Sequence, residues 1–180
     1  LSGRKRDSLD DVAAQLQDSF VHPLDVADEQ AILQAVTTVK EKYGKVDILI
    51  NNAGVSQRSL VTETNNDVGR KLMEVNFFGS VHLSKAVLPL MLASGKGNIV
   101  GMSSAAGKFG FPLRSYYSAS KHALHGFYET LGLELKDTEI YTTMVCPGRI
   151  KTDLSKSAMT GDGAPHEAMD PGQANGIDAD

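Results

Sequence analysis

Tyr117 and Lys121 are the pair of residues in this sequence with the clearest potential for chemistry. Residues four positions apart share one face of a helix, so the two side chains are expected to lie about one turn apart. A free phenol titrates near pH ~10, and a neighbouring ammonium group favours its ionised form. We therefore expect Lys121 to lower the pKa of Tyr117 and to make the phenol an acid/base group that works near neutral pH.

Ser104 is the third residue of this predicted site. A hydroxyl group opposite the phenol could hold a carbonyl or alkoxide oxygen as charge develops on it. Ser103 and Tyr116 are neighbours that compete for these roles, but the residue four positions after Tyr116 is serine and not lysine. The spacing of Tyr117 and Lys121 also occurs by chance, as a half-buried tyrosine beside a solvated lysine. The pair therefore needs support from the rest of the chain.

Short apolar runs alternate with amphipathic helical patterns, which predicts a doubly wound α/β sheet of parallel strands covered by helices on both faces. We expect strands at residues 20–26, 46–50, 98–103 and 139–145. We expect helices at residues 8–18 with Ser8 as the cap, at 28–44 between Asp28 and Gly44, at 65–92 as two abutting helices, and at 115–136. The run at 46–50 is apolar except for Asp47, which indicates a central strand buried on both faces.

The chemically interesting segments follow the predicted strands. In open parallel sheets ligands bind beyond the carboxyl ends of the strands, where loops and helix N-termini converge. Asn51 to Gly54, Ser103-Ser104 and the segment 146–152 all lie just past strands, so we expect them to meet at one rim. After Thr152 the composition shifts to Ser, Gly, Ala, Pro and Asp, which predicts that residues 153–180 form a surface loop or lid. The length favours a single domain over residues 1–180.

Composition and charge narrow the class of partner. The net charge is −4 and the basic residues are scattered along the chain, so nucleic acid is not an expected partner. We find no apolar run of about 18 residues that would span a bilayer, and no signal peptide. The single cysteine, Cys146, excludes an internal disulfide framework, is expected to be a buried thiol, and fits a cytoplasmic location. The five histidines lack metal-ligand spacing, so we expect no required metal.

The order and spacing of these motifs resemble the short-chain dehydrogenase/reductase family. The matching residues are Asp25, Asn51-Asn52-Ala53-Gly54, Asn76, Ser103-Ser104, Tyr117 through Lys121, and Pro147-Gly148. The resemblance covers about residues 1–152, and the segments Asn51 to Ser59 and Tyr117 to Leu124 are similar to the branch of dehydrogenase/reductase members 7 and 7B. It implies a Rossmann-like fold and hydride transfer between NADP(H) and a small or lipid-like carbonyl or secondary alcohol. It does not identify the substrate.

The resemblance implies a role for each of four catalytic residues. Tyr117 would protonate the carbonyl oxygen, or accept the alcohol proton in the reverse direction, and Lys121 would hold the nicotinamide ribose. Ser104 would bind the substrate oxygen, and Asn76 would support a water that passes protons from Lys121 to solvent. The implied cofactor contacts are Arg4, Asp25, Val26, Asn51, Ala53, Gly54, Tyr117, Lys121, Pro147, Gly148, Ile150 and Thr152.

The preference for NADP(H) over NAD(H) rests on Arg4 and Arg6. They follow what resembles the second strand of the family, where a guanidinium group pairs well with a 2′-phosphate. A basic segment can also be simply solvated, and Asp25 and Pro147-Gly148 can be ordinary turn residues. The resemblance further implies a homodimer or homotetramer that pairs through the helices at 65–92 and 115–136.

Two other functions fit part of this pattern. A non-catalytic dinucleotide-binding or interaction protein could keep the fold, but a structural role does not require Asn76, Ser104, Tyr117 and Lys121 together. A sugar epimerase or dehydratase uses the same tyrosine and lysine, but it usually carries a larger sugar-nucleotide domain than 180 residues provide. The oxidoreductase is therefore the leading hypothesis.

Two elements of the family have no counterpart in this sequence. They are the first strand with its turn Thr-Gly-x-x-x-Gly-x-Gly, whose backbone holds the pyrophosphate, and the last strand with the helix before it. We therefore expect this chain to be a piece of a longer product that carries both.

This expectation predicts that the 180-residue piece binds NADPH weakly or not at all, while the longer product binds it. The reason is that the backbone groups for the pyrophosphate lie outside the piece. Titration of both proteins with NADPH measures the difference, and equal affinities would refute the truncation.

Overall fold

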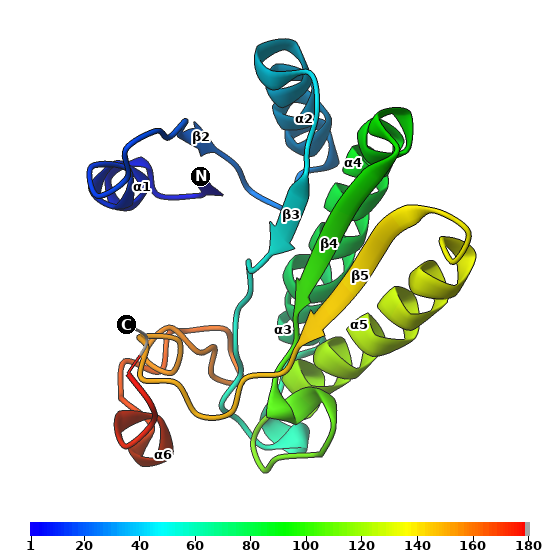
Figure 1. Ribbon diagram of the computed structural model, residues 1–180. Helices are drawn as coiled ribbons and strands as arrows, with labels where there is room; N and C mark the ends of the chain where they lie inside the picture. Colours follow the sequence, from blue (N-terminus) through cyan, green and yellow to red (C-terminus); the bar gives the residue numbers. More distant parts are fainter. Residues whose placement is uncertain (179–180) are drawn as a thin grey trace.

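Parallel strands form the centre of the fold in the computed structural model, which describes residues 1–178 (Figure 1). One sheet has the strand order β3-β4-β5, and a separate two-stranded sheet pairs β1 with β2; all of these pairs are parallel. The strands are β1 (Ser2–Gly3), β2 (His22–Pro23), β3 (Ile48–Asn51), β4 (Lys96–Met102) and β5 (Glu139–Val145). Helices connect successive strands of the larger sheet, so the predicted α/β fold with parallel strands is confirmed.

Helices α2 to α5 follow the predicted pattern closely. The two abutting helices expected at 65–92 are α3 and α4, joined by a π-helical turn at Glu74–Phe78. Asp28 caps α2 as expected, because its side chain accepts hydrogen bonds from two N–H groups of the first turn, and Gly44 ends the helix at a φ of 74°. The helices are α1 (Arg6–Ala13), α2 (Glu29–Tyr43), α3 (Asn66–Met73), α4 (Gly79–Ser94), α5 (Ser115–Glu134) and α6 (Pro171–Ala174).

Two predictions near the N-terminus need correction. Helix α1 begins at Arg6 with Lys5 as its N-cap and ends at Ala13, so the predicted cap at Ser8 and the predicted end at residue 18 are both wrong. The first helical turn starts early because the Lys5 carbonyl already accepts the Leu9 N–H at 3.2 Å. The strand expected at 20–26 is only His22–Pro23, because its partner β1 is itself two residues long.

The hydrophobic core lies between one face of the three-stranded sheet and helices α4 and α5 (Figure 1). Among the described residues the opposite face is open: Ile48 and Ile50 of β3 are 61% and 60% exposed. The prediction of a central strand buried on both faces, in a sheet covered on both faces, is therefore wrong for this part of the chain. The reason is that β3 is an edge strand and that α4 and α5 both pack on the face that carries Leu49 and Ile99.

The sequence predicts no apolar run of about 18 residues that would span a bilayer. In the structure, however, residues 66–94 form one continuous helical stretch. By length and composition this 29-residue stretch could cross a membrane, since an 18-residue window has a mean hydropathy of 1.3. The stretch is not one uninterrupted apolar run, because it contains the charged residues Arg70, Lys71 and Glu74. In the structure α4 packs against α2, β3 and β4, and α3 packs against α5.

The segment after β5 packs on the loop that follows β3. Met159 forms a parallel bridge with Gln57. The Met159 N–H donates to the Ser56 carbonyl, and the Arg58 N–H donates to the Met159 carbonyl, both at 2.8 Å. The predicted loop or lid at 153–180 is thus joined to the body by backbone hydrogen bonds, and its residues 179–180 lie outside the described residues.

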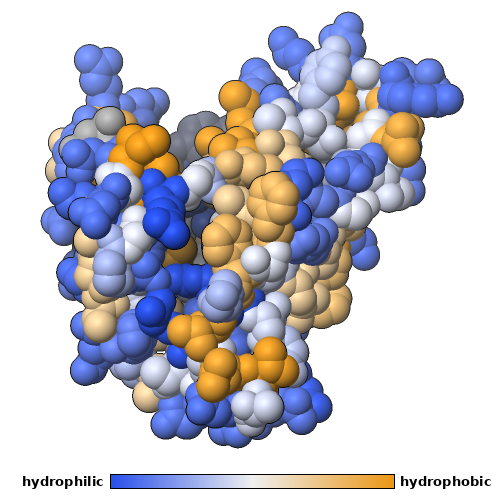
Figure 2. Space-filling model, turned by 90° about the horizontal axis from the view of Figure 1, so that it is seen from below, coloured by the Kyte–Doolittle hydropathy of each residue, from blue (hydrophilic) through white to orange (hydrophobic). Residues whose placement is uncertain are grey.

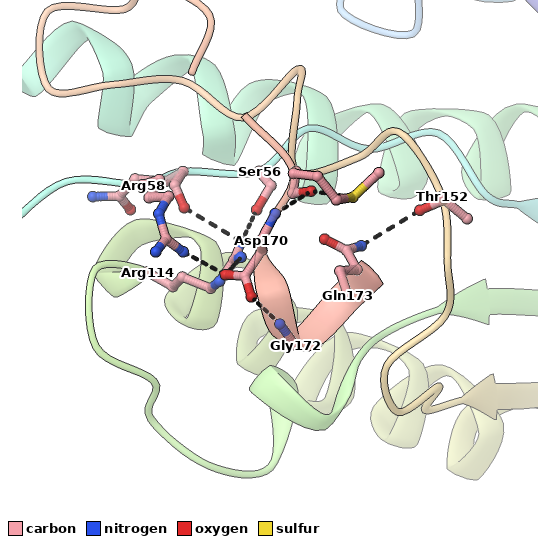
Figure 3. A network of polar contacts seen from close by, with 10 residues as sticks. Ser56, Arg58, Arg114, Thr152, Asp170, Gly172 and Gln173 are labelled. Atoms are coloured by element: carbon pink, nitrogen blue, oxygen red, sulfur yellow. Dashed lines mark hydrogen bonds and ion pairs between the residues drawn. The ribbon is translucent and has the colours of Figure 1, made fainter. Parts of the chain in front are cut away.

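Asp170 provides a second anchor for this segment (Figure 3). Its carboxylate pairs with Arg58 and with Arg114, and it accepts the Gly172 N–H at 2.9 Å as the cap of α6. Burial opposes ionisation of Asp170, but the Gly172 hydrogen bond and the two guanidinium groups outweigh it and hold the pKa below its usual value. The ionised carboxylate therefore ties α6 to the loop before α5.

A buried hydroxyl group at Tyr128 provides a test of the core. It lies 2.7 Å from Ser80 Oγ and 3.0 Å from Ser84 Oγ, and it accepts from Asn51 Nδ2 at 2.8 Å. We expect Tyr128→Phe to lower the free energy of unfolding by about 1–2 kcal/mol, because these polar groups lose a partner away from water. Urea unfolding measures this. Tyr43→Phe, at an exposed ring, is the control, and equal stabilities for all three proteins would contradict the prediction.

Candidate functional site

The predicted catalytic residues come together at the carboxyl end of the three-stranded sheet. Lys121 is buried, and its Nζ donates to the carbonyl oxygen of Met102, the last residue of β4, at 2.7 Å. Ser104 follows β4 and accepts the Ala106 N–H at 3.2 Å. Tyr117 lies one turn before Lys121 on α5, with Lys121 Nζ 5.8 Å from the centre of its ring. The end of β4 and the start of α5 thus hold three of the four residues.

Asn76, the fourth residue, lies in the π-helical turn between α3 and α4 and is 1% exposed. Its Oδ1 accepts the Val55 N–H at 2.8 Å, and its Nδ2 donates to the Val55 carbonyl at 2.9 Å and to Ser120 Oγ at 3.0 Å. A Cβ atom added to Gly54 would lie 3.3 Å from Asn76 Oδ1 and 3.6 Å from Lys121 Nζ. Asn76 therefore joins the loop after β3 to α5 directly beside Lys121.

The pKa of Tyr117 is raised, which contradicts our expectation that Lys121 lowers it. Burial of the phenol is the main cause, and the nearby Ser104 hydroxyl and the charge of Arg114 act in the opposite direction. Burial also lowers the pKa of Lys121 to about 8. The expectation failed because both groups leave water, and because the ammonium group of Lys121 is directed at the Met102 carbonyl.

Two of the predicted cofactor residues, Arg4 and Asp25, line a cavity of about 340 Å³. The residues of α3 and the following turn that line it include Lys71 and Glu74. Asp25 also accepts the Ala27 N–H at 3.0 Å, which is the turn-forming role considered from the sequence. Because Glu74 belongs to the same π-helical turn as Asn76, one turn connects the cavity to the catalytic cluster.

The remaining predicted contacts in the first half of the chain differ in accessibility. Ala53 and Gly54 are exposed at the end of β3. The Asn51 side chain is turned inward, where its Nδ2 donates to Ser84 Oγ at 3.0 Å and to Tyr128, so it fastens β3 to helices and not to a neighbouring strand. Val26 packs against the start of α4, since a Cβ atom on Gly79 would lie 2.8 Å from it.

The predicted contacts after β5 lie at the base of the C-terminal segment. The Pro147 carbonyl accepts the Ala105 N–H at 3.0 Å, which joins the loops after β4 and β5, and Gly148 is exposed. Ile150 forms a parallel bridge with Ile177. Thr152 accepts from Gln173 Nε2 at 3.4 Å (Figure 3), so its hydroxyl faces the C-terminal segment.

Cys146 is exposed, so the prediction of a buried thiol is wrong. It lies just past the end of β5, and its Sγ is 3.7 Å from Nε2 of His125 on α5, so the thiol sits at the rim of the sheet and not inside the core. Ser103, in contrast, is buried and lies 3.0 Å from the same nitrogen of His125. This contact agrees with a packing role for Ser103.

Sequence reasoning missed several residues that contact the cluster. The Met102 carbonyl accepts a hydrogen bond from Lys121, and Ser120 Oγ accepts one from Asn76. The Arg114 guanidinium lies 6.0 Å from the centre of the Tyr117 ring. A carbonyl group carries no signal in a sequence, and Arg114 has no distinctive spacing. Gln57, which contacts the start of α5, was missed for the same reason.

Exposed apolar side chains surround this end of the molecule. Leu60 and Val61 follow β3 in the chain and Phe109 and Phe111 follow β4, and all four side chains are exposed. Figure 2, which views the molecule from below, shows a band of apolar residues between hydrophilic regions. The polar cluster around Lys121 therefore lies at an end of the fold that also offers apolar contacts.

Comparison with known proteins identifies the family. The family model described as short chain dehydrogenase matches residues 1–162. The chain belongs to the short-chain dehydrogenase/reductase family. Dehydrogenase/reductase SDR family member 7B of Rattus norvegicus is 43% identical over an alignment of 189 positions, which covers 99% of this chain and 58% of the rat protein. This short-chain dehydrogenase chain thus spans little more than half the length of that relative.

Solved structures of short-chain dehydrogenases share the fold. One from Streptomyces avermitilis has a TM-score of 0.83 and 34% identity, covering 98% of this chain and 64% of its own. A gluconate 5-dehydrogenase from Burkholderia cenocepacia, in complex with NADP and tartrate, has a TM-score of 0.81 and 25% identity over 87% and 63% of the two chains. A member from Burkholderia phymatum, in complex with NAD, has a TM-score of 0.78 and 28% identity over 83% and 54%. Family members of this fold therefore bind either dinucleotide.

The lowered pKa of Lys121 predicts a specific pH dependence of stability. Between about pH 8 and 10.5 the unfolded chain keeps a proton that folded Lys121 has released, so the free energy of unfolding rises with pH. The shift from 10.5 to about 8 corresponds to a total of about 3 kcal/mol. Lys121→Met removes this contribution, so the wild type should gain about that much relative to the variant across the window. Urea unfolding at several pH values measures it, and parallel curves for the two proteins would rule it out.

Proposed function

We propose that the protein is an oxidoreductase that transfers hydride between NADP(H) and a carbonyl or secondary alcohol. The observation that carries the proposal is the convergence of Asn76, Ser104, Tyr117 and Lys121 at one end of the sheet, although they come from separate parts of the chain. Membership of the short-chain dehydrogenase family supports the same reaction class.

Tyr117 is the proton donor in the proposed reduction. Its phenol stays protonated at neutral pH, since the ordinary pKa of a phenol already lies well above 7 and burial raises the pKa of Tyr117 further, and the Ser104 hydroxyl lies near it. Ser104 and Tyr117 can therefore both hydrogen-bond a carbonyl oxygen, which stabilises the negative charge that develops there. The nicotinamide supplies the hydride when it is bound. Lys121, held by the Met102 carbonyl, binds the ribose, and Asn76 supports the proton path beside it.

NADP(H) is the proposed cofactor. Arg4, Arg70 and Lys71 bring positive charge to the cavity of about 340 Å³, which Asp25 and Glu74 also line, and Asp25 supplies a hydrogen-bond acceptor for an adenine ring. The three cationic side chains suit a 2′-phosphate better than a free ribose hydroxyl. Arg4, Asp25 and Val26 would hold the adenosine end, while the exposed backbone at Ala53 and Gly54 allows close approach of the rest.

The proposed substrate is a small or lipid-like carbonyl compound. The exposed apolar residues Leu60, Val61, Phe109 and Phe111 suit a substrate with an apolar body. For the whole protein we further propose a cytoplasmic location and a homodimer or homotetramer that pairs through α3–α4 and α5. The helical stretch 66–94 keeps much apolar surface uncovered, since 28% of its most apolar window is buried.

The test is NADPH oxidation by the full-length protein against a panel of carbonyl compounds. We expect Tyr117→Phe to lower kcat by at least about 100-fold on any accepted substrate, because it removes the proton donor but keeps the ring. NADH in place of NADPH should give a lower kcat/KM.

The control is Tyr43→Phe, which removes a hydroxyl from an exposed ring at the last residue of α2, outside the cluster. Unchanged turnover in Tyr117→Phe would refute the mechanism. If the wild type turned over no member of the panel, a non-catalytic dinucleotide-binding protein would be the better description.

A further inference from the structure

Gln57 has a long polar side chain that is completely buried, with 0% exposure. Its Nε2 lies 3.2 Å from Ser59 Oγ, 3.0 Å from Thr64 Oγ1 and 3.2 Å from Ser115 Oγ. Its Oε1 accepts the N–H groups of the two residues after Ser115, at 2.9 Å and 3.4 Å. Both the nitrogen and the oxygen of the carboxamide are therefore hydrogen-bonded. These bonds fix its orientation and offset the cost of burying it.

The two N–H groups that Gln57 binds belong to the first turn of α5. The first N–H groups of a helix have no partner within the helix and need one elsewhere. Arg114 is the N-cap of α5, and its side chain makes no capping hydrogen bond. Gln57 supplies the acceptor from 59 and 60 residues away in the sequence, at Tyr116 and Tyr117. The carboxamide thus takes the place of a local cap.

Gln57 is also fixed from the opposite side. Its backbone forms a bridge with Met159 of the C-terminal segment, and the carbonyl of Ser56 and the N–H of Arg58 both bond to the backbone of Met159 at 2.8 Å. A side chain that caps a helix positions it only if its own backbone is held. The hydrogen bonds to Met159 meet this condition.

We propose that Gln57 is a positioning residue for Tyr117. Its side chain is completely buried and so offers no surface to a ligand, and it acts by fixing the first turn of α5, in which Tyr117 is the third residue. Its effect on turnover rests on the proposed function. Its effect on the helix start does not, so the two can be tested separately.

Two substitutions test separately the capping oxygen of Gln57 and the absence of charge on its carboxamide. Gln57→Leu has a similar size but removes both the acceptor and the donor, so the N–H groups of Tyr116 and Tyr117 lose their partner. Gln57→Glu keeps an oxygen at the helix start, where a negative charge is favourable. That charge disfavours the phenolate, so Gln57→Glu should raise the pKa of Tyr117 further while it preserves the helix start.

The experiment combines amide hydrogen exchange, an absorbance titration and kinetics on the full-length protein. In Gln57→Leu we expect the amides of residues 115–118 to exchange about tenfold faster, because the cap is lost, with no change near Glu134. Gln57→Glu should restore slow exchange. The absorbance of ionised tyrosine, taken as the difference between each protein and its Tyr117→Phe counterpart, should show a higher pKa in Gln57→Glu. With NADPH and an accepted carbonyl, kcat should fall about tenfold in Gln57→Leu at unchanged KM for NADPH.

Thr138→Ala is the matched control, because Thr138 hydrogen-bonds the Leu135 carbonyl and the Ile140 N–H beyond the opposite end of α5. It should leave both the exchange at residues 115–118 and kcat unchanged. Unchanged exchange in Gln57→Leu, or an equal loss of kcat in Thr138→Ala, would overturn the proposal. If Gln57→Leu does not fold, the pKa of Tyr117 in Gln57→Glu decides, and an unshifted value would overturn it. If the wild-type protein reduces no carbonyl compound, the proposed function is wrong. The amide exchange of residues 115–118 and the tyrosine titration then decide the role of Gln57.

Discussion

The hydrogen bond from the Lys121 ammonium group to the Met102 carbonyl joins the catalytic helix to the central strand. A cation removed from water is costly unless polar groups replace the water, so its surroundings are constrained. Asn76 and Ser120 lie beside it and bond to each other, and Gly54 leaves the space that a Cβ atom would fill. The loop after β3, the turn between α3 and α4, the end of β4 and helix α5 therefore all meet around one ammonium group.

Much of the fold could be predicted because its signals are local. Asp28 and Gly44 mark the ends of α2, and Glu139–Val145 forms a strand with the bounds read from its apolar pattern. Burial was less predictable, because an apolar run shows that side chains avoid water but does not show what covers them. The run that contains Ile48 and Ile50 forms an edge strand whose outer face is open in the part of the chain that the structure describes.

The candidate site was predictable in position but less so in its chemistry. Motifs at strand ends locate Ser104 and Lys121 correctly at one rim, because parallel strands bring their carboxyl ends together. The contact of Gln57 with Tyr117 was not predictable, since it joins residues 60 positions apart and depends on the path of a loop. The exposure of Cys146 likewise depends on the path of the chain just past the end of β5, which no local pattern reveals.

The direction of the Tyr117 pKa shift reflects two opposing effects that the sequence could not weigh. A nearby cation favours the phenolate, whereas burial favours the neutral phenol, and burial wins here. The same burial lowers the pKa of Lys121 to about 8, so the lysine becomes the stronger acid of the pair. In the proposed reduction this order is useful: the proton rests on Tyr117, ready for donation. After Tyr117 has donated its proton, Lys121 is the group that gives one up more readily, and Asn76 lies beside it to support the transfer.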